Sequence, residues 1–412
     1  YIMMGELGLD GKLYPIKGVL AMAMQAKADG YLGILIPNEN AAEAALVDDM
    51  EIFCFEHLNE VVDFIADPNT KSPIKRTRLV QDNEPKSVTD FSDVKGQENV
   101  KRALEIASAG SHNIIMIGPP GAGKTMLAKS IVSILPPLNQ MEALETSKIY
   151  SITGKLDAVN KLLQTRPFRH PHHSLSAIAL IGGGSHPQPG EISLAHNGIL
   201  FLDELPEFNR SVIEVLRQPM EEGIVCIARA KMSVTFPARF MLMAAMNPCP
   251  CGYYNHPKKE CHCSPSLIQK YMHKISGPLL DRIDMHIEVV PILYNELRAS
   301  KQEESSATIA TRVKNAREIQ SHRFKNEAGT YTNAQMNSGQ LKKYCTISPE
   351  GEAILKMAME KFQLSARAFD RIIKVSRSIA DLDNSNAIQL NHISEALQFR
   401  SLDKSSWGQY KN

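Results

Sequence analysis

The stretch IIMIGPPGAGKTMLAKSIVSIL, residues 114–135, decides the fold. Four apolar residues lead into a loop, residues 118–125, that fits the pattern G-x-x-x-x-G-K-[ST], and a helical pattern follows. Glycines let such a loop curl so that its N–H groups point at phosphate oxygens, and the start of the helix favours an anion. The strand–loop–helix order therefore predicts a nucleotide phosphate site. The alternative is a glycine-rich turn that binds nothing, and a second motif makes this the weaker interpretation.

Within the loop, Lys124 is predicted to reach the β- and γ-phosphates and Thr125 to ligate Mg²⁺. The whole loop is expected to contact the nucleotide. Its residues are Gly118, Pro119, Pro120, Gly121, Ala122, Gly123, Lys124 and Thr125.

The second motif is GILFLDE, residues 198–204, an apolar strand that ends in two carboxylates. Ligands of open α/β sheets bind at the carboxyl ends of the strands. We expect Asp203 to hold Mg²⁺ and Glu204 to polarise the attacking water. A third strand, FMLMAAMN, ends in Asn247, which either orients water beside the γ-phosphate or only forms the turn before Pro248.

Two arginines are candidates for stabilising the charge of phosphoryl transfer. Arg282 lies in SGPLLDRID, and Arg367 lies in LSARAFDR at the head of a predicted helix. For an arbitrary arginine, a surface salt bridge is the more common role.

The rest of the chain gives the organisation. A length of 412 residues favours two or three domains. We expect a small α/β piece at 1–65, a polar linker at 66–90, an α/β core with a parallel sheet at 91–290, and a helical lid and tail at 291–412. The first residues lack an initiator methionine and begin within a motif, so we expect an upstream portion to be missing.

Bulk composition limits the function classes. Lys plus Arg number 46 and Asp plus Glu number 45, so any nucleic-acid contact requires a local basic patch. No apolar run is long enough to span a bilayer and no signal pattern opens the chain, so we expect no membrane partner and a cytoplasmic location.

A cysteine cluster stands out in NPCPCGYYNHPKKECHCSP. Four thiolates on one loop could enclose a structural Zn²⁺, and His256 or His262 could replace one of them. The alternative is four reduced cysteines in a surface loop. The predicted ligands are Cys249, Cys251, Cys261 and Cys263.

Two basic stretches remain. RPFRHPHHS either faces DNA or a pore, forms a second metal site, or packs against the ATPase core, which is the interpretation we favour for its histidines. EGIVCIARAKMSVTFPARF predicts a hairpin with Arg229 and Lys231 near its turn.

The order of these motifs resembles an AAA+ ATPase of the magnesium-chelatase-like branch, and more closely the ComM/YifB family. Long stretches carry the resemblance, among them FSDVKGQENVKRALEIASAGSHN, PGEISLAHNGILFLDELPEF, NPCPCGY and SGPLLDRIDMHIEV. The resemblance implies ATP and Mg²⁺ as ligands, Asn247 as sensor 1, Arg282 as an arginine finger acting on a neighbouring subunit, and Arg367 as sensor 2.

The resemblance also implies a hexameric ring helicase that drives branch migration of DNA. The loop GGGSHPQPG would be a helix-2 insert facing the pore, and Arg229 and Lys231 would contact DNA. Residues 1–65 would be the later half of a Lon-protease-type domain without proteolytic activity. The alternatives are a chelatase-type ATPase that remodels a protein partner, the regulatory ATPase of a Lon-like protease, and a nucleotide-switched scaffold with negligible turnover.

Overall fold

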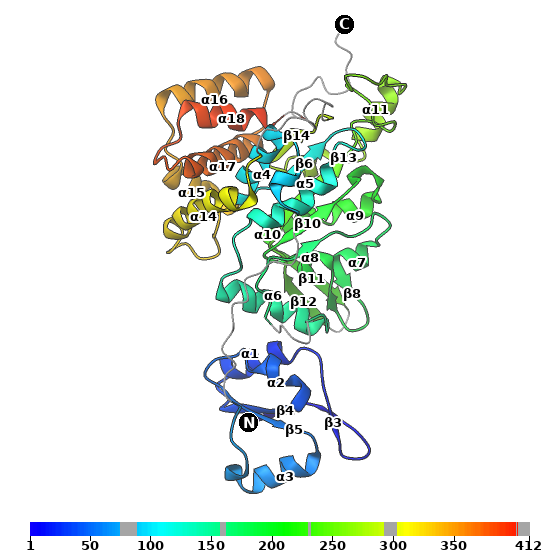
Figure 1. The fold of residues 1–412 in the computed structure, drawn as a ribbon, viewed down its shortest axis with the longest axis vertical. Helices are drawn as coiled ribbons and strands as arrows, with labels where there is room; N and C mark the ends of the chain where they lie inside the picture. The colour runs from blue at the N-terminus through cyan, green and yellow to red at the C-terminus, as the bar shows by residue number, and fades with distance from the viewer. Residues whose placement is uncertain (75–88, 157–161, 230–231, 292–302, 401, 403–412) are drawn as a thin grey trace.

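The computed structural model describes residues 1–74, 89–156, 162–229, 232–291, 303–400 and 402. A small N-terminal α/β unit, a central sheet covered by helices and a helical C-terminal part follow one another (Figure 1). This confirms the predicted fold class, an α/β core with a helical lid and an N-terminal α/β unit. The domain boundaries proposed from composition stay predictions.

Five parallel strands form the central sheet, in the order β14-β6-β13-β10-β7. The three middle strands are the three apolar runs predicted from the sequence, and they are buried along their whole length. Their side chains alternate between two apolar clusters: Ile114 and Met116 belong to one, and Ile115 and Ile117 to the other. The strands are β6 Ile114–Ile117, β7 Phe168–Arg169, β10 Ile199–Leu202, β13 Met241–Met246 and β14 Met285–Glu288.

The register of the sheet brings three chain segments to one edge. Met246 lies opposite Ile117, and Leu202 lies opposite Ala244. Because the strands are parallel, the loops that follow β6, β13 and β10 meet at their carboxyl ends. These loops begin the three motifs singled out in the sequence.

Helices cover both faces of the sheet. One face carries α4, α5 and the lid, and the other carries α7, α8, α9 and α12. The helices of the core are α4 Glu98–Gly110, α5 Lys124–Ser130, α6 Gln140–Ile152, α7 Ala177–Ile181, α8 Glu191–Leu194, α9 Arg210–Glu214, α10 Arg217–Glu222, α11 Pro265–Met272 and α12 Gly277–Leu280.

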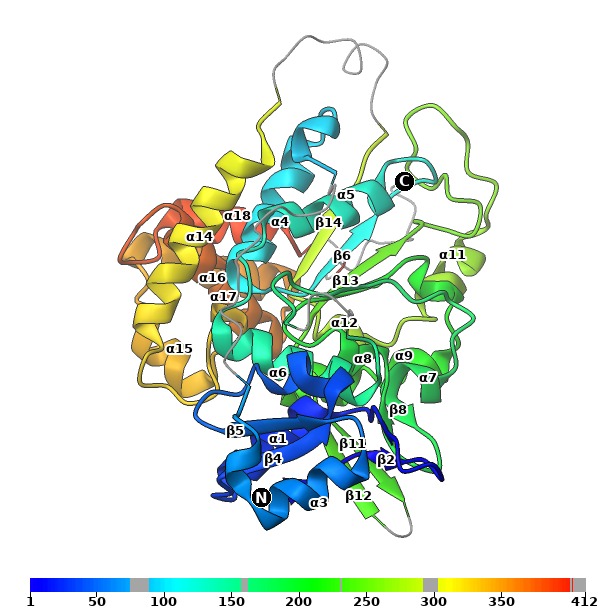
Figure 2. The same cartoon turned by 60° about the horizontal axis from the view of Figure 1, so that its bottom comes forward.

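Two hairpins project from the core side by side (Figures 1 and 2). The predicted hairpin is confirmed as β11 (Ile224–Arg229) paired with β12 (Met232–Pro237). The second hairpin, β8 (Gly182–Gly183) with β9 (Gln188–Pro189), lies inside the predicted insert. A Cβ added at Gly182 would lie 2.9 Å from the Ile227 side chain, so the two hairpins touch.

The C-terminal helices form the predicted lid, with α17 at its centre. Ser365 accepts the Ala368 N–H at 3.1 Å and so caps the start of α17, which packs against α4, α14 and α18. Within the described residues, no helix is both long and apolar enough to cross a bilayer. The lid helices are α14 Ser306–Arg323, α15 Ser338–Tyr344, α16 Pro349–Phe362, α17 Ala366–Leu382 and α18 Leu390–Gln398.

The N-terminal unit docks on helix α6 of the core. The Gly18 N–H donates to Ser151 O at 3.2 Å. The buried Glu43 carboxylate accepts the Leu20 N–H at 2.9 Å and also the Ser151 hydroxyl. The elements of this unit are β1 Ile2–Met3, β2 Glu6–Leu7, β3 Leu13–Tyr14, α1 Val19–Ala28, β4 Gly33–Pro37, α2 Ala41–Ala44, β5 Glu51–Phe55 and α3 Leu58–Ala66.

Candidate nucleotide site

The phosphate loop has the curled backbone that its glycines predict. Gly121 and Gly123 have φ values of 78° and 85°, which side chains rarely tolerate. A Cβ added at Gly118 would lie 2.3 Å from Val289 O, so this position requires glycine for a different reason. The loop ends where α5 begins, at Lys124. The N–H groups of the loop therefore lie directly before the N-terminus of α5, where an anion is favoured.

Lys124 is buried at the centre of the loop. Its Nζ donates to Gly118 O at 2.7 Å, to Pro119 O at 3.0 Å and to Asn247 Oδ1 at 3.1 Å. Burial lowers the pKa of Lys124, and Asp203 and Glu204 offset part of that effect. The three acceptors of this ammonium group are uncharged oxygens, and phosphate oxygens would supply the negative charge that would raise its pKa.

Thr125 and Asp203 meet across the loop, with Oγ1 donating to Oδ2 at 2.6 Å. They come from the start of α5 and from the end of β10, which the register places at the same edge of the sheet. A hydroxyl and a carboxylate oxygen at this separation form a hard oxygen donor set that fits Mg²⁺. The structure therefore brings together four of the predicted residues: Lys124, Thr125, Asp203 and Asn247.

Glu204 makes a contact of its own outside these hydrogen bonds. Its backbone is in the left-handed region, with a φ of 52°, and its N–H donates to Asp203 Oδ1 at 3.0 Å. Its carboxylate lies 3.7 Å from His173 Nδ1.

The two arginines of the RPFRHPHHS stretch pair with carboxylates of the core, whereas His170 and His172 are exposed. Arg166 pairs with Glu142 at 2.9 Å, and Arg169 pairs with Glu191 at 2.6 Å. Sequence reasoning missed that His173 lies beside Glu204. The strand that positions this histidine, β7, has two residues and gives no recognisable pattern.

Arg282 lies at the opposite edge of the sheet from the phosphate loop. Its carbonyl accepts Asn113 Nδ2 at 3.3 Å, and Asn113 directly precedes β6. The four residues of β6, at about 3.3 Å each, separate this point from the loop by about 13 Å. The guanidinium pairs with Glu221 at 2.6 Å. This position fits a residue that acts on the nucleotide of another subunit better than one that acts on the nucleotide of its own chain.

The structure places Arg367 at the start of α17. It is exposed on the first turn of α17 and, within the described residues, makes no hydrogen bond or ion pair. One turn further along, Arg371 pairs at 2.8 Å with Asp284, two residues after Arg282. Arg282 is therefore not placed next to the phosphate loop of its own chain, and within the described residues no hydrogen bond or ion pair joins Arg367 to that loop.

The four clustered cysteines converge, with all their Sγ atoms within 4.8 Å of one another. Three of the Sγ–Sγ distances are 3.3, 3.6 and 3.8 Å. Four sulfurs at about 2.3 Å from a tetrahedral Zn²⁺ would be about 3.8 Å apart. The thiols therefore fit zinc without help from a histidine, and His256 Nδ1 instead accepts the N–H groups of Lys258 and Lys259 at 3.0 and 2.9 Å.

Electrostatics within the cluster favour one thiolate. Burial raises the pKa of Cys251, but hydrogen bonds from the Tyr253 N–H and the neighbouring thiols outweigh it and lower the pKa to about 6. Burial raises the pKa of Cys261 to about 12, with further effects of its neighbours. In the described part of the chain, this is the one place where three or more Cys, His, Asp or Glu ligands gather, so the second metal site considered for the histidines is not formed there.

The cysteine loop also supports the phosphate loop. A Cβ added at Gly252, which has a φ of 83°, would lie 2.6 Å from Pro120 Cδ. The two loops are therefore in direct contact.

Of the two predicted DNA contacts, Arg229 is exposed at the end of β11. It lies beside the second hairpin, since a Cβ added at Gly183 would be 3.4 Å from Arg229 Nη2. Lys231 lies outside the described residues.

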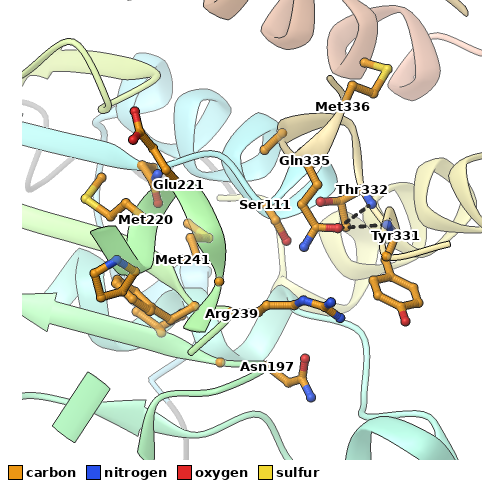
Figure 3. A pocket seen from close by; sticks show the side chains of 18 of the residues that line it. Ser111, Asn197, Met220, Glu221, Arg239, Met241, Tyr331, Thr332, Gln335 and Met336 are labelled. Carbon is orange, nitrogen blue, oxygen red and sulfur yellow. Dashed lines mark hydrogen bonds between the residues drawn. The ribbon is translucent and has the colours of Figure 1, made fainter. Parts of the chain in front are cut away.

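A cavity of about 420 Å³ lies elsewhere, between the amino-terminal edge of the sheet and the lid. Figure 3 shows Arg239 from the core pointing at Tyr331 from the lid, and the guanidinium is 5.3 Å from the ring centroid. Gln335 Oε1 accepts the Tyr331 N–H at 2.8 Å and so orders this wall. The cavity belongs to the contact between core and lid, and the phosphate site lies at the other edge of the sheet.

Three family models match this chain. The model described as magnesium chelatase, subunit ChlI, matches residues 90–297, its C-terminal counterpart matches residues 303–400, and a further ChlI model matches residues 1–40.

Relatives are similar over almost the whole length. The YifB protein of Salmonella typhimurium is 42% identical over 409 residues, covering 98% of this chain and 78% of that protein. The competence protein ComM of Haemophilus influenzae is 42% identical over 403 residues, covering 96% of this chain and 77% of that protein. The chloroplastic magnesium-chelatase subunit ChlI of Oryza sativa is 25% identical over 240 residues, covering 53% of this chain and 52% of that protein.

Proposed function

This chain belongs to the magnesium-chelatase-like AAA+ family that includes YifB and ComM, and from that premise we propose that it couples hydrolysis of Mg-ATP to remodelling of branched DNA. Membership of the family implies ATP hydrolysis with Mg²⁺. The observation that carries the proposal is the meeting of Lys124 and Thr125 with Asp203 and Asn247 at one edge of the sheet.

In the proposed mechanism, the loop N–H groups and Lys124 bind the β- and γ-phosphates. Thr125 and Asp203 would hold Mg²⁺, which when bound neutralises phosphate charge. Asn247 orients the attacking water, and Glu204 polarises it. Arg282 acts on the nucleotide of a neighbouring subunit, and its place at the opposite edge of the sheet from the phosphate loop supports this division. Arg367 acts as the sensor-2 arginine.

The assembly we propose is a hexameric ring in the cytoplasm, with DNA as its partner. The relative in Haemophilus influenzae is named a competence protein, and this supports DNA as the substrate class. The two adjacent hairpins, with exposed Arg229, are the proposed contact surface, and Lys231 stays in the proposal from its place in the sequence. The cysteine cluster is proposed to hold a structural Zn²⁺ that orders the loop against Pro120.

The test is steady-state ATP hydrolysis without DNA, with single-stranded DNA and with a four-way junction. The Lys124→Ala variant is the blank. We expect the junction to stimulate turnover, and the variant to lose both basal and stimulated turnover. Turnover that ignores every DNA would refute the DNA-motor proposal and favour the chelatase-type alternative, an ATPase that remodels a protein partner.

A further inference from the structure

The cavity between core and lid is lined by more cations than carboxylates. Its volume of about 420 Å³ is that of a pocket for a small molecule, and such pockets often form where two domains meet. The phosphate loop lies at the other edge of the sheet, so the proposed function leaves this cavity without a role. The lining includes three carboxylates and five cations, and the cations are Arg166, Arg239, Arg317, Arg371 and Lys374.

Two of these cations already have a counter-charge. Arg166 pairs with Glu142 at 2.9 Å, and Arg371 pairs with Asp284 at 2.8 Å. The carboxylate of Glu221, which also lines the cavity, pairs at 2.6 Å with an arginine outside the lining. These groups are neutralised within the protein, so they would add little to the binding of an anion.

The other three cations have no such counter-charge. Arg317 donates to a backbone carbonyl at 2.8 Å and to the Ser111 hydroxyl at 2.6 Å, and Lys374 donates to a backbone carbonyl at 3.0 Å. The Arg239 guanidinium lies over the Tyr331 ring, 5.3 Å from its centroid. Among the residues that the structure describes, none forms an ion pair with these three cations, and one lining carboxylate is left against them.

Burial makes the charge on two of these cations costly. It lowers the pKa of Arg317 to about 9, and the nearby Arg166 guanidinium adds to this effect. It also lowers the pKa of Lys374 to about 8, and Arg371 adds to this effect. A buried cation is stabilised by an opposite charge close to it. An anion in the cavity would supply that charge to both groups.

The other lining groups indicate the kind of anion. Arginine and lysine are the side chains that bind phosphate, the first as a fork and the second as a point charge. Figure 3 shows the Arg239 side chain reaching from the core toward Tyr331 of the lid, with the amides of Asn197 and Gln335 nearby. The Tyr331 side chain is 56% exposed, so a base can stack on it. The lining therefore fits a nucleotide whose phosphates meet the cations.

We propose that the cavity between core and lid is a second phosphate site, which binds a nucleoside diphosphate through Arg239 of the core and through Arg317 and Lys374 of the lid. Three cations without a counter-charge match the charge of a diphosphate better than that of a monophosphate. Because the cations come from both walls, the ligand joins the lid to the core. The site is independent of the phosphate loop.

Calorimetric titration of the Lys124→Ala chain with ADP and with inorganic pyrophosphate tests this site. The variant removes the lysine of the phosphate loop, so the cavity is the site that remains. We expect ADP to bind once per chain and pyrophosphate to bind more weakly, because pyrophosphate lacks the base. ADP should also raise the midpoint of thermal unfolding, since a ligand stabilises the state that binds it. Equal affinities would overturn the base contact and assign the cavity to pyrophosphate itself.

Three variants, each combined with Lys124→Ala, locate the ligand. Arg239→Gln and Lys374→Gln remove a charge and keep an amide donor, so the fold should persist, and the unfolding midpoint without ligand checks this. Each should weaken ADP binding about 10-fold or more, because hydrogen bonds between charged groups are the stronger ones. Tyr331→Ala should weaken the binding of ADP and leave that of pyrophosphate unchanged. Arg210→Gln is the matched control, because Arg210 is exposed on α9, outside the lining, and it should keep the affinity.

Two results would overturn the proposal. If ADP does not bind to Lys124→Ala in a saturable way, the phosphate loop of this chain or of a neighbouring subunit is the one place where ADP binds. If ADP binds to Lys124→Ala, but Arg239→Gln and Lys374→Gln leave its affinity unchanged, the ligand lies outside the cavity.

Discussion

Replacing Asp284 with alanine should weaken a buried contact between the lid and the sheet. The side chain is 1% exposed. It pairs with Arg371 at 2.8 Å, accepts the Asn113 N–H at 2.8 Å and lies 3.7 Å from His112 Nδ1. Burial alone would raise the pKa of this carboxyl, but the positive charges of Arg371 and Lys374 oppose that effect, and the pKa is held well below its ordinary value. The carboxylate is therefore ionised and fully partnered.

The magnitude follows from what the alanine leaves behind. Arg371 would lose its counter-charge, and the Asn113 N–H would lose its acceptor in a buried site. Breaking a buried pair in this way costs about 3–5 kcal/mol. A loss of 1 kcal/mol lowers the unfolding midpoint of a domain of 150–250 residues by about 2–4 °C. The core and lid together are larger, so we use about 2 °C per kcal/mol and expect the midpoint to fall by about 6–10 °C.

The assay is differential scanning calorimetry of the whole chain, with two further variants. Asp284→Asn keeps an oxygen acceptor for Asn113 and should fall by less than the alanine variant. Glu318→Ala is the matched control, because the Glu318 side chain is 61% exposed and its partner on α14, Lys314, is 67% exposed, so its midpoint should move by less than about 2 °C. A midpoint for Asp284→Ala no lower than that of Glu318→Ala would refute the reasoning.

Three further predictions follow from the same contacts. His112 and His286 are fully buried, and burial lowers the pKa of each below 6.5, so they stay neutral in the folded chain at a pH where they are protonated in the unfolded chain. Urea unfolding should therefore give a free energy of unfolding up to about 3 kcal/mol lower at pH 5.5 than at pH 7.5, and equal values would contradict this. Metal analysis should find about one zinc per chain, and a strong chelator or the double variant of Cys261→Ser with Cys263→Ser should remove it and lower the unfolding midpoint. The control Cys226→Ser changes an exposed, isolated cysteine and should keep the metal. Mixing inactive Lys124→Ala with inactive Arg282→Ala should restore part of the ATP turnover, because an intact phosphate loop on one subunit then meets an intact Arg282 on its neighbour. A mixture as inactive as its components would show that Arg282 does not act on the neighbouring nucleotide.

The features predicted from the sequence are those that a local pattern encodes. Three strands were recognisable because each is apolar throughout, as burial on both faces requires. The spacing of residues within each motif predicted the phosphate loop and the position of Asp203 at the end of its strand. The two C-x-C pairs predicted thiols that lie close together, as binding of one metal requires. Each of these signals lies within about twenty residues of chain.

The features that were missed depend on pairs distant in the sequence. Asp284 and Arg371 are 87 residues apart, and no local pattern links them. His173 could not be placed beside Glu204, because a two-residue strand sets its position and carries no periodicity. The contact between Gly252 and Pro120 likewise arises only once the sheet has brought the ends of β6 and β13 together.

The docking of the N-terminal unit has a mechanical consequence. Since the Glu43 carboxylate is shared between the first turn of α1 and Ser151 of α6, this unit is joined to a helix of the core by buried hydrogen bonds. The N-terminal unit and α6 are therefore expected to move as one body, and any tilt of α6 displaces helix α3, which lies farthest from the core in Figure 1, more than it displaces α1.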